Sequence, residues 1–161
     1  MKIAVIASTS QMLLTLKEAL ESNPGQDQFI FLQRRSEKLT FEEVDLFSTQ
    51  IIVTDAADVN KEDLATIATS TRNSTNPAFI YITPSHTEAQ LMEIMHAGIT
   101  EVLTLPLQTQ ALKEAIERIR SRHYIALATS PRGKILTFVS CKGGAGATFL
   151  ATNLGYALAT E

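Results

Sequence analysis

The chain opens with Lys2-Ile3-Ala4-Val5-Ile6-Ala7-Ser8, in which residues 3–7 form an unbroken apolar run. A strand with one face in water alternates apolar and polar residues, whereas a continuous run suits a strand that is buried on both faces. Strands of that kind belong to parallel sheets that carry helices on both sides. The opening run therefore predicts the first strand of an α/β fold.

Further along the chain, short apolar runs alternate with segments of helical periodicity, which is the order of repeated βα units. We expect an α/β, doubly wound, five-stranded parallel sheet in the order 2-1-3-4-5, flanked by five helices, which is a flavodoxin-like arrangement. The other predicted strands are Phe29–Leu32, Ile51–Val53 followed by Thr54-Asp55, Ala78–Thr83 and Glu101–Thr104, and the predicted helices are Gln11–Glu21, a weak one over Phe41–Phe47, one around Leu64–Ala68, Glu88–Ala97 closed by Gly98, and Gln110–Arg122.

Composition narrows the class of protein. The 161 residues are 45% hydrophobic and 19% charged with a net charge of −3, which fits a folded chain and gives no general attraction to nucleic acid. A single cysteine excludes an internal disulfide framework, and no apolar run approaches the ~18 residues of a membrane span. We expect a soluble cytoplasmic protein that binds no nucleic acid.

A second domain is predicted near the end of the sequence. The βα alternation breaks at 124–133, where Ser130-Pro131-Arg132-Gly133 is rich in turn residues, and a new strand is predicted at Ile135–Val139. Glycines and an apolar helix follow that strand, which is the order of a phosphate-binding P-loop. We expect residues 1–123 to be one domain, 124–133 a linker, and 134–161 a partial P-loop βα unit that begins a longer nucleotide-binding domain.

The glycine loop carries the most specific chemical signal. Gly143, Gly144 and Gly146 can turn backbone N–H groups toward a phosphate, and the following helix directs its positive end at the same anion. Ala147 stands where an ordinary P-loop has the lysine that holds the phosphates, and Thr148 supplies the hydroxyl for Mg²⁺. The alternative is a glycine turn that binds no ligand.

Lys142, at the start of this loop, resembles the additional lysine of the deviant P-loop of ParA/MinD-type ATPases. The resemblance implies ATP with Mg²⁺ as the cofactor of an intact parent protein, with Lys142 reaching the phosphates of a partner subunit. For residues 134–161 alone we expect no tightly bound nucleotide. With Ala147 in place of lysine, the parent is expected to be at most a slow ATPase.

The first five units resemble the receiver domain of response regulators. Such a domain has two acidic Mg²⁺ ligands after its first strand, but this sequence has Ala7-Ser8 there. Asp55 matches the phosphoacceptor position and Thr83 the switch hydroxyl, whereas Leu105 replaces the expected lysine before Pro106. We therefore expect a pseudo-receiver with a cis Leu105–Pro106 bond, in which Asp55 caps loop N–H groups and Thr83 is a turn residue.

A degenerate receiver followed by a ParA/MinD-type loop is similar to the TadZ/CpaE family, which helps to assemble the tight-adherence secretion machinery of Flp-type pili. The resemblance implies a localisation or protein-interaction module, recruited to the cell pole at the inner membrane through protein partners, in a parent that uses ATP binding as a dimerisation switch. A homodimer and contacts through Glu88–Arg122 are expected, with membrane association only indirect. The alternative is a true phosphorelay receiver that accepts phosphate on Asp55 and regulates an attached ATPase.

Overall fold

The computed structural model divides the chain into two compact units, Met1–Ala126 and Leu127–Glu161. No helix in the described part of the chain is long and apolar enough to cross a membrane. The structure describes residues 1–21, 27–34, 38–72, 77–129, 136–140, 142–144 and 146–159.

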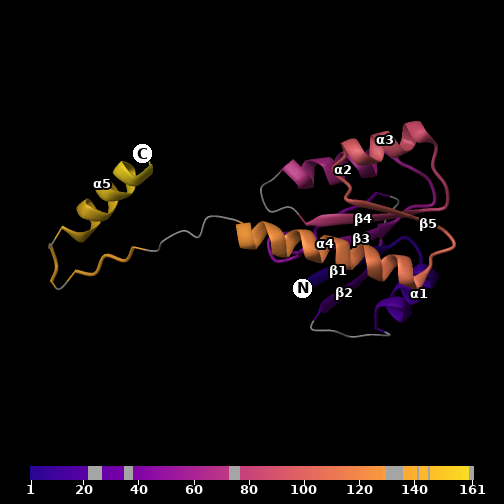
Figure 1. The fold of residues 1–161 in the computed structure, drawn as a ribbon, viewed down its shortest axis with the longest axis horizontal. Coiled ribbons are helices and arrows are strands. Elements are labelled where there is room, and N and C mark those ends of the chain that lie inside the picture. The colour runs from indigo at the N-terminus through magenta and orange to yellow at the C-terminus, as the bar shows by residue number, and fades with distance from the viewer. Residues whose placement is uncertain are drawn as a thin grey trace. The chain divides into compact units, whose positions relative to one another are not determined.

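The first unit is built on a five-stranded sheet in which every neighbouring pair is parallel (Figure 1). Its order is β2-β1-β3-β4-β5, as the sequence predicts for a flavodoxin-like fold. The strands are β1 (Lys2–Ala7), β2 (Gln28–Gln33), β3 (Ile51–Asp55), β4 (Ala78–Thr83) and β5 (Glu101–Thr104).

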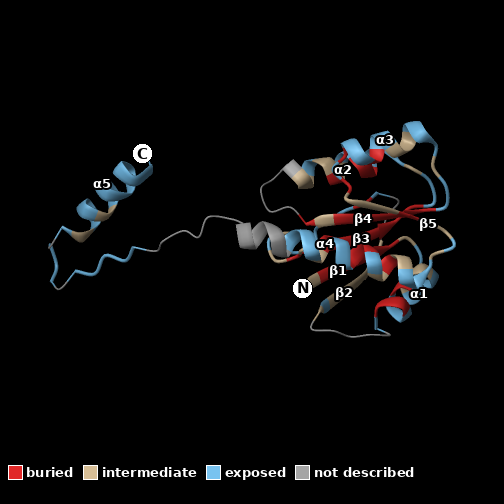
Figure 2. Cartoon of the chain, viewed as in Figure 1, coloured by how far each residue is buried: buried red, intermediate tan, exposed pale blue. Residues whose placement is uncertain are grey.

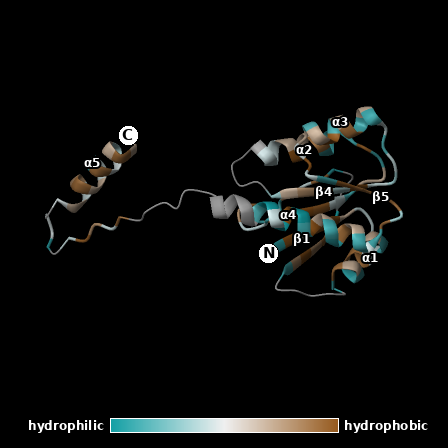
Figure 3. Cartoon of the chain, in the orientation of Figure 1, coloured by the Kyte–Doolittle hydropathy of each residue, from teal (hydrophilic) through white to brown (hydrophobic). Residues whose placement is uncertain are grey.

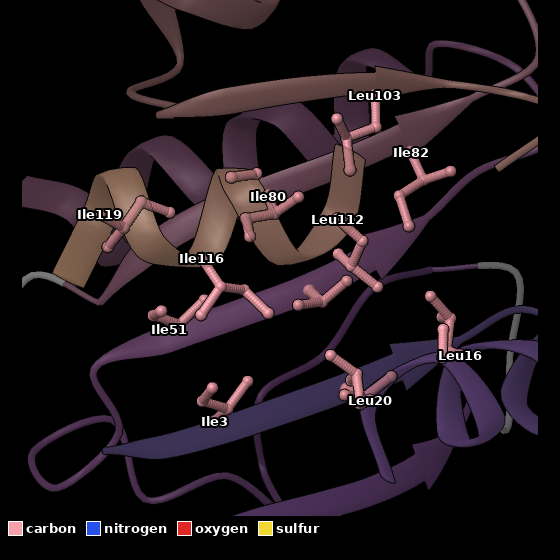
Figure 4. Close-up of a cluster of buried hydrophobic side chains, with 14 of the residues drawn as sticks. Ile3, Leu16, Leu20, Ile51, Ile80, Ile82, Leu103, Leu112, Ile116 and Ile119 are labelled. Atoms are coloured by element: carbon pink, nitrogen blue, oxygen red, sulfur yellow. The ribbon is translucent and has the colours of Figure 1, made fainter. Parts of the chain in front are cut away.

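Helices cover both faces of this sheet, and the sheet separates the core into two layers (Figure 2). Helices α1 (Ser10–Glu21) and α4 (Thr109–Thr129) pack on one face, where Figure 4 shows their leucines and isoleucines meeting the strands. Helices α2 (Lys61–Arg72) and α3 (Glu88–His96) pack on the other face. The opening strand serves both layers: Ile3, Val5 and Ala7 lie in the first, and Ala4 and Ile6 lie in the second.

Helix α3 has defined ends on both sides. Thr87 caps its start in a capping box with Gln90, which satisfies N–H groups that have no partner inside the helix. The helix ends before Gly98, whose φ of 88° is the left-handed conformation that favours glycine. A Cβ at Gly98 would also lie 2.9 Å from the Thr71 hydroxyl of α2, so this position must stay small for the two helices to pack.

The weak helix predicted over Phe41–Phe47 is not formed, and this stretch consists of turns and irregular backbone. Asp45 accepts a hydrogen bond from the N–H of Phe47 at 3.1 Å and one from the Ser48 hydroxyl at 2.6 Å. Such local bonds offer the backbone an alternative to the helical pattern. An irregular loop therefore follows β2 where the predicted helix would lie.

Asp63 of α2 anchors this loop from inside the protein. Its carboxylate pairs with Arg34 at 2.7 Å and accepts the N–H of Leu39 at 2.9 Å. The side chains of Asp63 and Arg34 are 1% and 8% exposed, and Leu39 and Val44 of the loop are buried in the second layer. One carboxylate thus fixes both the end of β2 and the start of the loop.

The chain after Arg122 departs from the sequence prediction at the end of α4 and at the predicted strand. Helix α4 continues through Thr129, past the predicted end at Arg122, because residues 124–129 contain no glycine or proline; the predicted linker 124–133 therefore begins inside a helix. Residues 136–140 form no strand, and the predicted start at Ile135 lies outside the described residues. A strand requires a neighbour for its backbone hydrogen bonds, and no described segment pairs with this one.

The buried pair gives a stability prediction. Asp63→Ala should lower the free energy of unfolding by about 3–5 kcal/mol, because it removes one partner of a buried ion pair and the acceptor of the Leu39 N–H. Urea denaturation would measure this loss. Glu62→Ala is the matched control on the same helix, since its ion pair with Lys38 lies in water and should contribute little to stability. Equal losses in the two variants would contradict this account.

Candidate functional site

The positions that the receiver resemblance singles out lie together at the carboxyl end of the sheet. All five strands are parallel, so their carboxyl ends lie on the same side, where α/β proteins usually bind ligands. Ser8 follows β1, Asp55 ends β3, Thr83 ends β4, and Leu105-Pro106 follows β5. The fold thus brings together four sequence segments that are far apart along the chain.

Ser8 engages both oxygens of the Asp55 carboxylate. One oxygen accepts the Ser8 backbone N–H at 2.7 Å, and the other accepts the Ser8 hydroxyl at 2.5 Å. The Asp55 residue is only 5% exposed. This is the capping of a loop N–H that we expect of a strand-end aspartate. In the sequence, Ser8 stands where a receiver has a metal-binding carboxylate. Its bond to Asp55, 47 positions away, has no signature in the sequence.

The residues at the carboxyl end of the sheet do not fit the Mg²⁺ that a receiver holds. Mg²⁺ prefers oxygen ligands, and carboxylates above all, in near-octahedral geometry. Ala7 offers no side-chain oxygen, and Ser8 offers a neutral hydroxyl where a receiver has a carboxylate. Asp55 is then the one carboxylate among the matched positions, where a receiver has three, and each of its oxygens accepts a hydrogen bond from Ser8.

The other two receiver positions have structural roles here. The buried Thr83 hydroxyl donates to the carbonyl of Ser85 at 3.1 Å, which fits a turn residue. The Leu105–Pro106 bond is cis, which confirms the prediction made from the sequence. Leu105 packs against the apolar layer of α1 and α4, so an apolar contact stands where a receiver places its lysine ammonium.

The sequence does not predict a second polar group, which Tyr81 of β4 forms with Asp63 and Arg34. Burial, together with the nearby Asp63 carboxylate, raises the pKa of the Tyr81 hydroxyl to about 12. Tyr81 therefore stays neutral across physiological pH. Neither Tyr81, Asp63 nor Arg34 belongs to a sequence motif, and only the pairing of strands and helices brings them together.

The glycine loop precedes helix α5 (Ala147–Ala159) in the second unit. Gly144 and Gly146 have φ values of 77° and 76°, and the Gly146 carbonyl accepts the N–H of Leu150 at 3.0 Å as the helix begins. Left-handed glycines let a loop curl before a helix. Lys142, Gly143 and Thr148 are exposed, while Cys141 and Ala145 lie outside the described residues.

Helix α5 leaves large apolar side chains in contact with water. Figure 3 shows brown, apolar residues along α5, and Figure 2 shows most of the same helix in the pale blue of exposed residues. No residue of this helix is buried. Helices that are apolar on several sides normally lie inside a protein. The exposed large apolar residues are Phe149, Leu150, Leu154, Tyr156 and Leu158.

No protein-family model and no curated protein matches this sequence. Solved structures do match its fold. A pilus assembly-related protein from Burkholderia pseudomallei is 22% identical with a TM-score of 0.65, over 76% of this chain and 90% of that one. A pilus assembly protein, CpaE, from Burkholderia thailandensis is 21% identical with a TM-score of 0.64, over 75% and 98% of the two chains.

A response regulator receiver domain protein from Clostridium thermocellum matches as well. It is 22% identical with a TM-score of 0.62, over 77% of this chain and 97% of that one. At these identities the likeness establishes the fold alone. The chain therefore contains a receiver-like fold, and that fold is shared by proteins of pilus assembly and by receivers of signal transduction.

The Asp55–Ser8 contact predicts how the site responds to a phosphate mimic. Mg²⁺ with beryllofluoride, or with acetyl phosphate, should neither shift the amide resonances around Asp55 and Thr83 nor add mass to the protein, because the ligands and the lysine that would offset the added charge are missing. NMR titration and intact-mass measurement test this. Stoichiometric, Mg²⁺-dependent modification that disappears in Asp55→Ala would refute it.

Proposed function

We propose that this chain is an atypical receiver module for localisation or protein interaction in a TadZ/CpaE-like protein of pilus assembly. The observation that carries the proposal is the Asp55 carboxylate, held by Ser8 at the place where receivers accept phosphate. A fold shared with pilus assembly-related proteins supports the choice of system. The module would act through its surface, without a phosphorylation step, on protein partners at the cell pole.

The partner surface is assigned to the stretch Glu88–Arg122, which contains α3, β5 and most of α4. On α3, Met92 and Met95 are 58% and 63% exposed. They are three residues apart and so share one side of the helix. Exposed methionines are flexible apolar groups that suit a protein contact.

This surface gives the test of the module. The double variant Met92→Glu/Met95→Glu should abolish polar foci of a fluorescently labelled parent protein, because it places two charges in an apolar contact. Fluorescence microscopy measures the foci, and no phosphodonor should be needed for them to form. Phe47→Glu is the matched control, since Phe47 is 85% exposed and lies outside α3, β5 and α4. Foci that survive the double variant would contradict the assignment.

Charged residues of the same stretch are less suitable for this test. Arg118 pairs with Glu101 of β5 at 2.8 Å, and Glu93 lies 3.8 Å from Lys61 of α2. Reversing either charge would also disturb contacts within the fold. The methionine variants avoid this, because both side chains point largely into water.

In the intact parent, the proposal gives the glycine loop the role of an ATP-dependent dimerisation switch. Gly143, Gly144 and Gly146 would offer backbone N–H groups to the phosphates. Lys142 would reach the phosphates across the dimer, and Thr148 would hold Mg²⁺. The left-handed glycines and the exposed side chains of Lys142 and Thr148 support this reading. Cell-pole recruitment at the inner membrane would then follow from protein contacts.

Two substitutions test the switch in the intact parent. Ala147→Lys should tighten ATP binding by about tenfold or more, because it restores a cation beside the phosphates. Lys142→Ala should weaken ATP-dependent dimerisation and leave the fold of the first unit unchanged. Calorimetry, ultracentrifugation and an ATPase assay measure these effects. Rapid hydrolysis by the unmodified protein, insensitive to both substitutions, would show that another site carries the activity.

A phosphorelay receiver is the second candidate function. The position of Asp55 at the end of β3 favours it, because this is where a receiver accepts phosphate. In this case Asp55 would accept a phosphoryl group and regulate an attached ATPase. The phosphate-mimic experiment above separates the two candidates, since only this one requires modification of Asp55.

A further inference from the structure

Strand β2 forms one edge of the sheet and leaves half of its backbone groups facing outward. The N–H of Gln28 donates to Met1 and that of Arg34 to Ala7, so the even-numbered residues bond to β1. Backbone groups of a strand alternate in direction, and those of Phe29, Phe31 and Gln33 therefore point away from the sheet. Within the described part of the chain, no backbone hydrogen bond reaches these outward groups.

The two edges of the sheet are protected to different degrees. Sheet edges in natural proteins are usually short, charged or interrupted by proline, which prevents pairing with other chains. β5 has four residues and carries Glu101, which pairs with Arg118. β2 has six residues, reads Gln28-Phe29-Ile30-Phe31-Leu32-Gln33, and contains neither a charge nor a proline. Only the β2 edge is therefore open to pairing.

Apolar groups border β2 on both faces of the sheet. On one face Phe29 and Phe31 stack at 5.9 Å, and Leu14 of the neighbouring helix α1 is 60% exposed. On the other face Leu32 and Ile6 form the apolar part of a hollow of about 210 Å³, where the irregular loop replaces the predicted helix. The rest of the hollow is lined by polar and charged residues, which are Gln33, Arg34, Lys38, Thr40, Glu42 and Glu43. The β2 edge thus lies beside partly exposed apolar side chains on one face and beside a mixed apolar and charged hollow on the other.

We infer that a second copy of this chain pairs with β2, strand against antiparallel strand, across a two-fold axis at Phe31. A two-fold contact pairs this strand with the same strand of the other copy, so a strand with a net charge would repel its partner, whereas β2 carries no charge over its six residues. With the axis at Phe31, Phe31 faces its own copy and Phe29 faces the copy's Gln33. This register pairs all three outward-facing residues.

The same register places side chains in the hollow. Residues 30 and 32 share the face on which Leu32 lines the hollow, because alternate residues of a strand point to the same side. Ile30 of one copy would lie opposite Leu32 of the other and cover the apolar part of that hollow. Pairing uses the β2 edge of each copy, and no β2 edge is then left for a third copy. The assembly therefore closes as a dimer and does not grow into a fibre.

The experiment measures association and edge protection on the 161-residue chain. Sedimentation equilibrium should show a monomer–dimer equilibrium, and NMR amide exchange at Phe29, Phe31 and Gln33 should slow as the protein concentration rises. The amides of Gln28, Ile30 and Leu32 are the internal reference, because β1 already protects them in the monomer. A monomer at every concentration, with no such slowing, would overturn the inference.

Gln33→Pro tests the contact directly. Proline removes an N–H that points away from β1, so the sheet keeps its bonds, whereas the dimer loses two symmetry-related bonds. The dimer dissociation constant should rise at least about tenfold. Gln33→Ala controls for the lost bond to the Ser10 hydroxyl and should leave the dimer intact.

Ile30→Lys is a second variant that keeps the backbone intact and places a charge beside Leu32 of the other copy. It should weaken the dimer as well, if it retains the amide protection of the reference residues. A dimer that persists in both variants would overturn the inference. So would a dimer that only Met92→Glu/Met95→Glu disrupts, since the contact would then belong to α3, as in the proposed function.

Discussion

The structure depends on the exclusion of water from both faces of β1 and β3. Ile3–Val5 and Ile51–Val53 are fully buried, so each strand needs a helical layer above and another below. Parallel strands with crossover helices meet this requirement, and they bring all carboxyl ends to one edge. The location of the candidate site thus follows from the burial of two short apolar segments.

Where the second predicted helix is absent, a charged contact takes over part of its task. The Arg34–Asp63 pair and the Leu39 N–H hold the loop against the sheet, while Leu39 and Val44 supply its apolar contacts. A buried ion pair contributes little net stability, but loss of one partner is costly. Its main effect is to fix the loop in one place. β2 is less buried than β1 and β3 because it has a neighbouring strand on one side only.

The sequence predicted those parts of the fold that are governed by local patterns. Short apolar runs indicated strands β1 to β4, and the alternation of strands with helical segments indicated the fifth strand at Glu101–Thr104. The helix at Phe41–Phe47 was wrong because side-chain bonds of Asp45 compete with the helical pattern. The strand at Ile135–Val139 is not seen at residues 136–139, because pairing depends on a neighbour that a local pattern cannot reveal. The Ser8–Asp55 and Arg34–Asp63 contacts join distant residues and have no sequence signature.

The Ser8–Asp55 contact also bears on how such a module would behave in time. A phosphorylated aspartate persists for a while after the signal has ended, and so gives a regulator a short memory. On the proposed function, a carboxylate that is held by Ser8 and not phosphorylated would keep no such record. On the proposed function, the occupancy of the module would follow the free concentration of its partner at each moment by mass action. A cell would then control it through synthesis, degradation and the supply of partners.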